Sequence, residues 1–93
     1  MKLFYIIVIK MNKEKYTTDI LDIMATQKRG FSVADIMLQL NTLYAPRGEK
    51  PDQKVVEEVL NELTEKGYLK RFTVGIIPQW KITEEGEDYF YSL

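Results

Sequence analysis

Residues 59–86 read VLNELTEKGYLKRFTVGIIPQWKITEEG, and this segment indicates the fold more specifically than any other part of the sequence. Its helical spacing of apolar residues ends at Gly67, which lets the chain leave a helix and turn directly into a strand. Two extended runs follow, residues 68–74 and 79–82, and residues 75–78 join them in a tip that is not a standard two-residue turn. Thr83 then suits the cap of a short acidic helix. The stretch predicts helix, hairpin and helix in that order.

A first helix is predicted upstream, over residues 17–29. Thr17 or Thr18 suits its N-terminal cap, and apolar residues recur along one face from residue 20 to residue 24. Gly30 suits a left-handed stop. Phe31 either packs back onto the next helix or forms a short first strand.

The second and third helices each begin at a recognisable capping residue. Ser32 and Asp35 form the S-x-x-D pattern of a capping box, and apolar residues from Val33 to Leu43 supply a buried face. Residues 45–51, APRGEKP, contain two prolines and a glycine and predict a loop. Asp52 then caps a third helix, whose apolar positions 55, 56, 59, 60 and 63 share one face.

This order of elements resembles the winged helix-turn-helix superfamily over residues 17–92. Regulators of the MarR and PadR families typically end the third helix in L-x-x-x-G-[YLF]-[LI] and close the hairpin with a hydrophobic residue and T-x-x-G. The matching pieces here are LTEKGYL at residues 63–69 and ITEEG at residues 82–86. The resemblance implies an α+β, mainly α, winged helix: a three-helix bundle with a β-hairpin wing and a short C-terminal helix. It also implies a small DNA-binding transcriptional regulator.

A narrower likeness concerns IPQWKI, residues 77–82, which looks like the proline–tryptophan wing of Zα-type domains that bind left-handed nucleic acid. Those domains also use an asparagine and a tyrosine on the third helix, where this chain has Glu57 and Asn61. Trp80 shares a strand face with Ile82, which favours core packing over an exposed stacking platform. The Zα interpretation is therefore disfavoured.

Residues 1–16 form an apolar and basic extension in front of the winged-helix domain, residues 17–93. The apolar run LFYIIVI, residues 3–9, is too short to cross a bilayer, which takes about 20 residues. We expect it to dock, as strand or helix, on the domain or on a second copy, with a membrane anchor as the alternative. Together with the apolar residues at 89–93 it exceeds what one small core absorbs. This favours a homodimer sealed by both termini and no membrane partner.

The amino-acid composition excludes several classes of protein function. A chain of 93 residues is one domain, and it contains no cysteine and no histidine. Disulfide frameworks, zinc fingers and histidine acid–base chemistry are thereby excluded. The carboxylates at residues 84–88 have no catalytic partners and are typical of a solvated acidic face. We expect neither an enzyme nor a metal or other cofactor, and a cytoplasmic location.

Charge is segmented along the chain although the net charge is only −1. Residues 67–82 carry three basic residues and no acid, whereas residues 52–66 carry five acids and two lysines. Phosphate attracts the first segment and repels the second. Because the third helix is acidic, a winged-helix module that binds protein instead of DNA is the alternative function.

The candidate contacts to double-stranded DNA are polar or basic residues in three places. They are Gln53, Lys54 and Asn61 on the third helix; Lys70, Arg71 and Lys81 on the wing strands; and Lys28, Arg29, Arg47 and Lys50 at helix ends and in the loop. The arc of the third helix predicted to face outward also carries Glu57, Glu58 and Glu65, which oppose entry into a groove.

Overall fold

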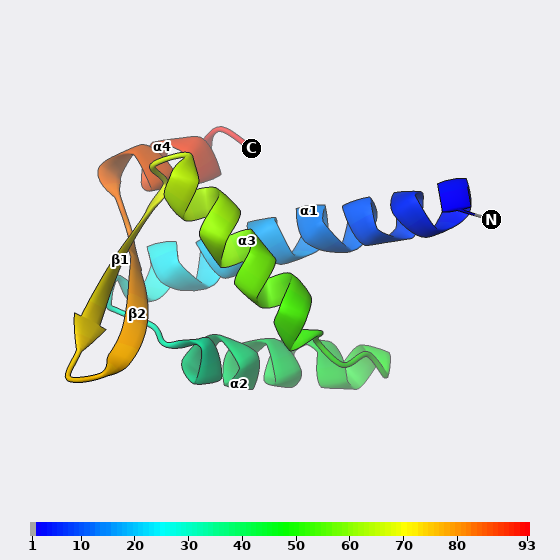
Figure 1. Ribbon diagram of the computed structural model, residues 1–93, viewed down its shortest axis with the longest axis horizontal. Helices are drawn as coiled ribbons and strands as arrows, with labels where there is room; N and C mark the ends of the chain where they lie inside the picture. Colours follow the sequence, from blue (N-terminus) through cyan, green and yellow to red (C-terminus); the bar gives the residue numbers. More distant parts are fainter. Residues whose placement is uncertain (1) are drawn as a thin grey trace.

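The computed structural model describes the backbone of residues 2–93 and the side chains of residues 12–93. The elements are α1 (Lys2–Gln27), α2 (Val33–Tyr44), a 3₁₀ turn η1 (Ala45–Arg47), α3 (Gln53–Glu65), β1 (Leu69–Val74), β2 (Ile77–Ile82) and α4 (Glu84–Tyr91). Three helices, a hairpin and a short closing helix form a winged helix, as predicted (Figure 1).

Helix α1 begins far upstream of residue 17, so the predicted start at Thr17 or Thr18 is wrong. Residues 2–27 contain no proline or glycine that would interrupt a helix. The two threonine hydroxyls do not cap: they donate to the carbonyls of Lys13 and Glu14, at 2.7 and 3.2 Å. The predicted docking of residues 3–9 lies outside the described side chains.

The turn after α1 departs from its prediction at Gly30. The left-handed residue is Lys28, with φ 51°, whereas Gly30 is not left-handed. Gly30 serves close packing instead, because a Cβ there would lie 2.7 Å from Phe72 Cζ and 2.6 Å from Gln79 Oε1. The glycine therefore lets the α1–α2 turn approach the hairpin.

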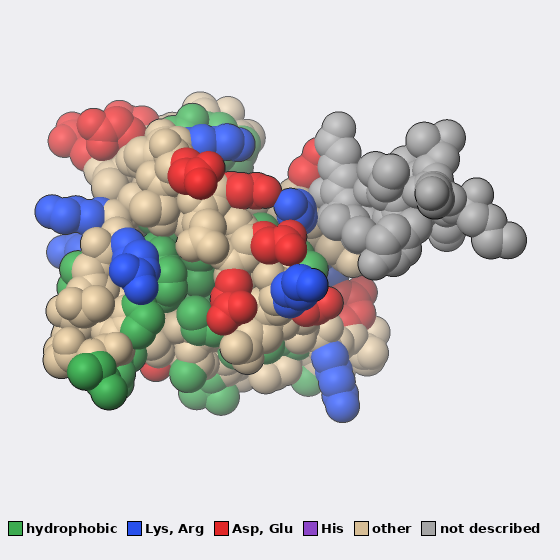
Figure 2. Space-filling model, viewed as in Figure 1, with side chains coloured by type: hydrophobic (Ala, Val, Ile, Leu, Met, Phe, Trp, Pro, Cys, Tyr) green, Lys and Arg blue, Asp and Glu red, His purple; other side chains and the backbone are tan. Residues whose placement is uncertain are grey.

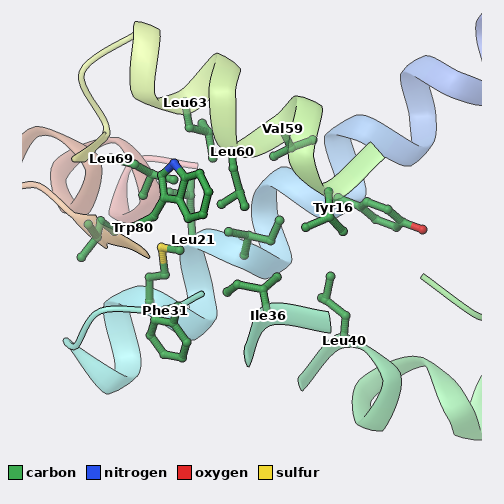
Figure 3. Close-up of a cluster of buried hydrophobic side chains, with 14 of the residues drawn as sticks. Tyr16, Leu21, Phe31, Ile36, Leu40, Val59, Leu60, Leu63, Leu69 and Trp80 are labelled. Carbon is green, nitrogen blue, oxygen red and sulfur yellow. The ribbon is translucent and has the colours of Figure 1, made fainter. Parts of the chain in front are cut away.

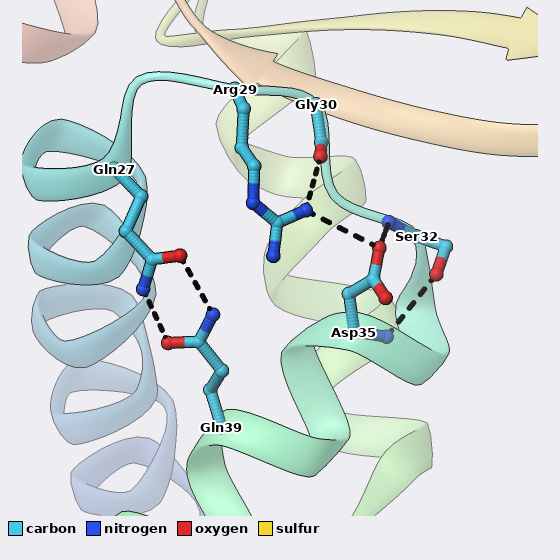
Figure 4. Close-up of polar contacts among 6 residues, drawn as sticks. All are labelled: Gln27, Arg29, Gly30, Ser32, Asp35 and Gln39. Atoms are coloured by element: carbon cyan, nitrogen blue, oxygen red, sulfur yellow. Dashed lines mark hydrogen bonds and ion pairs between the residues drawn. The ribbon is translucent and has the colours of Figure 1, made fainter.

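The caps predicted at Ser32, Asp52 and Thr83 are confirmed. Ser32 and Asp35 form the reciprocal capping box, with both bonds at 3.1 Å (Figure 4). The Asp52 carboxylate accepts from the N–H of Lys54 at 3.0 Å, and the Thr83 hydroxyl accepts from the N–H of Gly86 at 3.0 Å. The buried face predicted for α2 is wrong at Leu43, which is 43% exposed at the end of the helix.

The hairpin is tighter than predicted. Strand β2 begins at Ile77, directly opposite Val74, so Gly75 and Ile76 form a two-residue turn. Gly75 has φ 63°, which suits a two-residue hairpin turn with glycine in first position. Phe31 adds an isolated antiparallel bridge to Trp80, with both backbone hydrogen bonds at 2.8 Å. Phe31 thus pairs with the hairpin at a single position, where a first strand was one alternative, and its side chain is also buried in the same cluster as Ile36.

The core lies between the helices and the inner face of the hairpin (Figure 3). Trp80 is 5% exposed and Ile82 is also buried, which confirms that they pack inward. Helix α4 seals the hairpin base: Tyr68 and Tyr89 stack with ring centroids 4.4 Å apart. The buried cluster consists of Tyr16, Ile20, Leu21, Met24, Ala25, Phe31, Ile36, Leu40, Tyr44, Val56, Val59, Leu60, Leu63, Leu69, Trp80 and Ile82.

Candidate nucleic-acid interface

The hairpin carries basic side chains on both faces. Lys70 and Lys81 are direct cross-strand partners, both exposed, on the face opposite buried Leu69 and Ile82. Like charges placed directly opposite each other destabilise a sheet unless an anion joins them. Arg71 lies on the other face, with its guanidinium carbon 5.6 Å from the centroid of the Trp80 ring.

These three cations have no ion-pair partner among residues 12–93. The ion pairs within that range involve Lys13, Lys15 and Arg29. Residues 67–83 contain no acid, and the nearest acids along the chain follow the hairpin base, at residues 84–88 on α4. The arrangement suits contacts with phosphate on either side of the hairpin.

Helix α3 presents a mixed surface. Gln53, Lys54 and Asn61 are exposed as predicted, together with Glu57 and Glu65. In Figure 2, acidic side chains lie along the visible face of the domain between basic ones.

Glu58 is exposed only in part, because its carboxylate lies toward α1 while 45% of the side chain stays exposed. Lys13 lies between the carboxylates of Glu58 and Glu62, at 3.3 and 2.9 Å. Hydrogen bonds to Glu62 and then Glu58 raise the pKa of Lys13. Two of the acids of α3 are therefore partly neutralised from α1, and sequence spacing within α3 could not reveal this partner.

Arg29 belongs to the turn between α1 and α2. Its guanidinium donates to the Gly30 carbonyl at 3.0 Å, lies 3.7 Å from Asp35 and stacks 4.0 Å from the Phe31 ring centroid. Figure 4 also shows the paired amides of Gln27 and Gln39, which join α1 to α2. The backbone N–H of Ser32 and, more weakly, Arg29 lower the pKa of Asp35. Arg29 therefore contacts the α1–α2 turn while about half of its side chain stays exposed, and neighbouring Lys28 is exposed as well.

A tyrosine clasp, which sequence reasoning missed, holds the loop before α3. The Tyr44 hydroxyl donates to Asp19 at 2.5 Å, and the Tyr16 hydroxyl accepts from the backbone N–H of Asp52 at 2.9 Å. The Tyr16 and Tyr44 rings stack 5.7 Å apart, and Lys15 pairs with Glu49. Burial and the Asp19 carboxylate raise the pKa of Tyr44. The clasp fixes where α3 begins.

The ten candidates form separate groups rather than one site. Lys70, Arg71 and Lys81 come together on the hairpin. The loop and the start of α3 lie at the opposite end of α2 (Figure 1), whose 12 residues span about 18 Å. That second group contains the exposed residues Arg47, Lys50, Gln53 and Lys54.

Two further surface features are apolar. The hairpin tip exposes Ile76 and its neighbours, and hydrophobic side chains appear at the lower left of Figure 2, where Figure 1 draws the tip. A shallow groove of about 570 Å³ lies between α1 and α2, lined by Ile23, Leu38 and Leu43 among others.

Two kinds of site are absent from the described part of the chain. Residues 12–93 hold no group of three or more His, Cys, Asp or Glu side chains placed to bind a metal ion. Within the same part of the chain, every helix is too short or too polar to cross a membrane.

Comparison with known proteins supports the fold. No protein-family model and no curated protein matches the chain. The hsRosR chain of the hsRosR-S4 complex superimposes with a TM-score of 0.71 and 19% identity, over 83% of this chain and 64% of that one. A structure of the DNA recognition and protein interaction domains of HOP2 superimposes with a TM-score of 0.60 and 20% sequence identity, over 73% of this chain and 98% of that one. This chain thus covers less than two thirds of the hsRosR chain.

Proposed function

We propose that this chain is a winged-helix DNA-binding protein that acts as a small transcriptional regulator of the MarR/PadR type. One observation carries the proposal: a winged-helix scaffold presents Lys70, Arg71 and Lys81 on both faces of a hairpin, with no ion-pair partner among residues 12–93. The HOP2 structure, whose description includes a DNA recognition domain, lends support at the level of the shared fold.

The hairpin cations supply affinity and position. Each cation that neutralises a phosphate releases counterions, so binding weakens as salt rises. Arg71 lies over the buried Trp80 ring, which restrains its side chain before DNA arrives. Lys70 and Lys81 relieve their mutual repulsion when they share a phosphate.

Helix α3 supplies base contacts at its exposed face. Gln53, Lys54 and Asn61 carry the donors and acceptors that read base edges in a major groove. Glu57 and Glu65 oppose this approach, because they face phosphate oxygens with like charge. We expect α3 to contribute less affinity than the hairpin, while Lys28, Arg47 and Lys50 contact the backbone from the turn and the loop.

The test is duplex binding across a salt series, followed by fluorescence anisotropy. The wild-type chain is expected to bind most tightly at low salt and to weaken steeply as salt rises. The triple variant Lys70→Ala/Arg71→Ala/Lys81→Ala should lose most of this affinity, while Lys66→Ala, an exposed cation at the end of α3, should change little. Absence of salt-sensitive binding, or equal binding by the triple variant, contradicts the proposal.

A protein-binding module is the second candidate, favoured by the exposed acids Glu57 and Glu65 on α3. Such a module predicts no duplex binding at any salt concentration. It also predicts that charge reversal at Glu57 weakens association with a basic protein partner without affecting nucleic acid. The salt series therefore separates the two candidates.

We also propose a homodimer that buries the apolar termini. Tyr91 and Leu93, at the end of the chain, are 69% and 64% exposed. A dimer offers two hairpins to one duplex and doubles the number of phosphate contacts. Light scattering of the full chain should give about twice 10.9 kDa.

A chain that starts at Met11 tests whether residues 1–10 take part in this dimer. All described core residues, from Tyr16 onward, are retained in it. Circular dichroism checks that the shortened chain still folds. A fall to the monomer mass supports a role for residues 1–10, and an unchanged dimer mass rules that role out.

A further inference from the structure

The tip of the hairpin is an apolar wedge whose exposure the isolated domain does not explain. Ile76 is 95% exposed, and Val74 and Ile77 beside it are each more than half exposed. Two-residue turns favour Gly, Asn, Asp or Ser, whose backbones or polar side chains suit such a position. A stiff, β-branched isoleucine there leaves apolar surface in water, which is typical of an interaction site.

A single side chain lies at the outermost point of the hairpin. Gly75 has no side chain, so Ile76 is the one side chain on the two-residue turn. Pro78, one residue after Ile77, restricts the backbone behind it. A narrow apolar point with a stiff base is suited to insertion between flat surfaces.

The surroundings of the tip favour an anionic partner. Residues 67–83 contain three cations and no acid. Arg71 precedes Val74 by three residues, which is about 10 Å of extended strand. The minor groove of B-form DNA is about 7.5 Å deep. A tip on the groove floor therefore leaves Arg71 near the rim, where the phosphates lie.

We propose that residues 74–77 enter the minor groove, and that Ile76 inserts at a base step, partly unstacks it and kinks the duplex. This inference rests on the proposed function and adds a deformation of DNA to it. Apolar wedges act in this way in proteins that bend DNA, and flexible pyrimidine–purine steps deform most readily. The expected target is therefore a duplex with a TA step between the phosphates that the hairpin cations hold.

The experiment places 2-aminopurine, whose fluorescence rises on unstacking, at a TA step of a short duplex, with the full chain at saturating concentration. Wild type should raise the fluorescence about threefold, and Ile76→Ser should lose most of that rise while still saturating the duplex, with about tenfold weaker binding. Leu38→Ser, an exposed apolar residue removed from α2 instead, should behave like wild type. The same duplex without a TA step should respond less.

The outcomes separate this inference from the proposed function. An equal fluorescence rise from Ile76→Ser and wild type at saturation overturns the wedge and leaves DNA binding intact. No salt-sensitive binding by wild type overturns both. If Ile76→Ser instead lowers the oligomeric mass, or abolishes binding to phosphatidylserine vesicles while the fluorescence rise persists, the tip serves a second copy or a membrane surface and the wedge is contradicted.

Discussion

The hairpin and α3 are the two surfaces with which a winged helix can meet a duplex, and in this chain they differ in charge. Residues 67–82 carry three cations and no acid, whereas residues 52–66 carry five acids and two lysines. A segment with cations and no acid attracts phosphates wherever they lie along it. A segment with both charges attracts phosphates only where its cations, and not its carboxylates, meet them. Under the proposed function, we therefore expect the hairpin to supply most of the affinity and α3 to select bases.

Their attachment to the core differs as well. The hairpin depends on a few buried side chains at its base, above all Trp80 and Ile82, and on the bridge to Phe31. Helix α3 buries four residues along one face, Val56, Val59, Leu60 and Leu63. The hairpin is therefore expected to be the part more easily disabled by one substitution.

The largest expected effect tests that attachment. Trp80→Ala removes the buried anchor of the hairpin and should lower the free energy of unfolding by about 3–5 kcal/mol. Urea unfolding followed by circular dichroism measures the change. Lys81→Ala, its exposed neighbour on the opposite face, should stay within about 0.5 kcal/mol of wild type. A loss below about 1 kcal/mol for Trp80→Ala would show that the hairpin is not held by its base.

A smaller effect concerns the turn that carries Phe31 to the hairpin. Asp35→Ala removes half of the capping box and should cost about 0.5–1 kcal/mol near neutral pH. The folded-state pKa of Asp35 is lowered, so its contribution is present above the unfolded pKa and is lost as pH falls through the folded pKa. The difference in the free energy of unfolding between Asp35→Ala and wild type should therefore disappear at acid pH. For Asn41→Ala, the corresponding difference should not depend on pH. A gap independent of pH contradicts this account.

Removal of a carboxylate from α3 should sharpen the contrast between the two surfaces. Glu57→Gln takes a negative charge from the exposed face and should tighten duplex binding about threefold at low salt. Anisotropy titration measures the change, and Asp22→Asn, on α1, is the matched control. Weaker binding by Glu57→Gln would instead show that Glu57 accepts a hydrogen bond from a cytosine amino group.

The smallest effect comes from the lysine that shields α3. Lys13→Met leaves Glu58 and Glu62 without their partner and should weaken duplex binding about twofold. The change should diminish at high salt, because these side chains are between 29% and 48% exposed and salt screens their charges. Binding that is unchanged at low salt would place this side of α3 away from the phosphates.

Local chemistry made much of the fold predictable. The caps at Ser32, Asp52 and Thr83 each involve a donor within three residues, so a short window of sequence is enough to find them. The turn at Gly67 is equally local, and its φ of 83° is the left-handed conformation that glycine suits.

Features that depend on distant partners were not predictable. Gly30 reads as a helix stop, but its packing partners Phe72 and Gln79 lie on the hairpin. Lys13 meets Glu62 across 49 positions, and Tyr16 meets Asp52 across 36. Of the candidate site, the hairpin cations were found as a group because they lie on two neighbouring extended runs. The pairing of Lys70 with Lys81 was not predictable from the expected tip over residues 75–78, and the involvement of Arg29 in the α1–α2 turn required the fold.

Two single-charge variants distinguish the hairpin from α3 as the main source of affinity for DNA. Arg71→Ala and Lys54→Ala each remove one exposed cation, from the hairpin and from α3 respectively. The logarithm of the duplex association constant is measured against the logarithm of salt concentration for both variants and wild type. Arg71→Ala should reduce the slope by about 0.9 and the low-salt affinity about fivefold, while Lys54→Ala should leave the slope almost unchanged. A larger loss of slope and affinity in Lys54→Ala than in Arg71→Ala would contradict the division of roles between hairpin and α3.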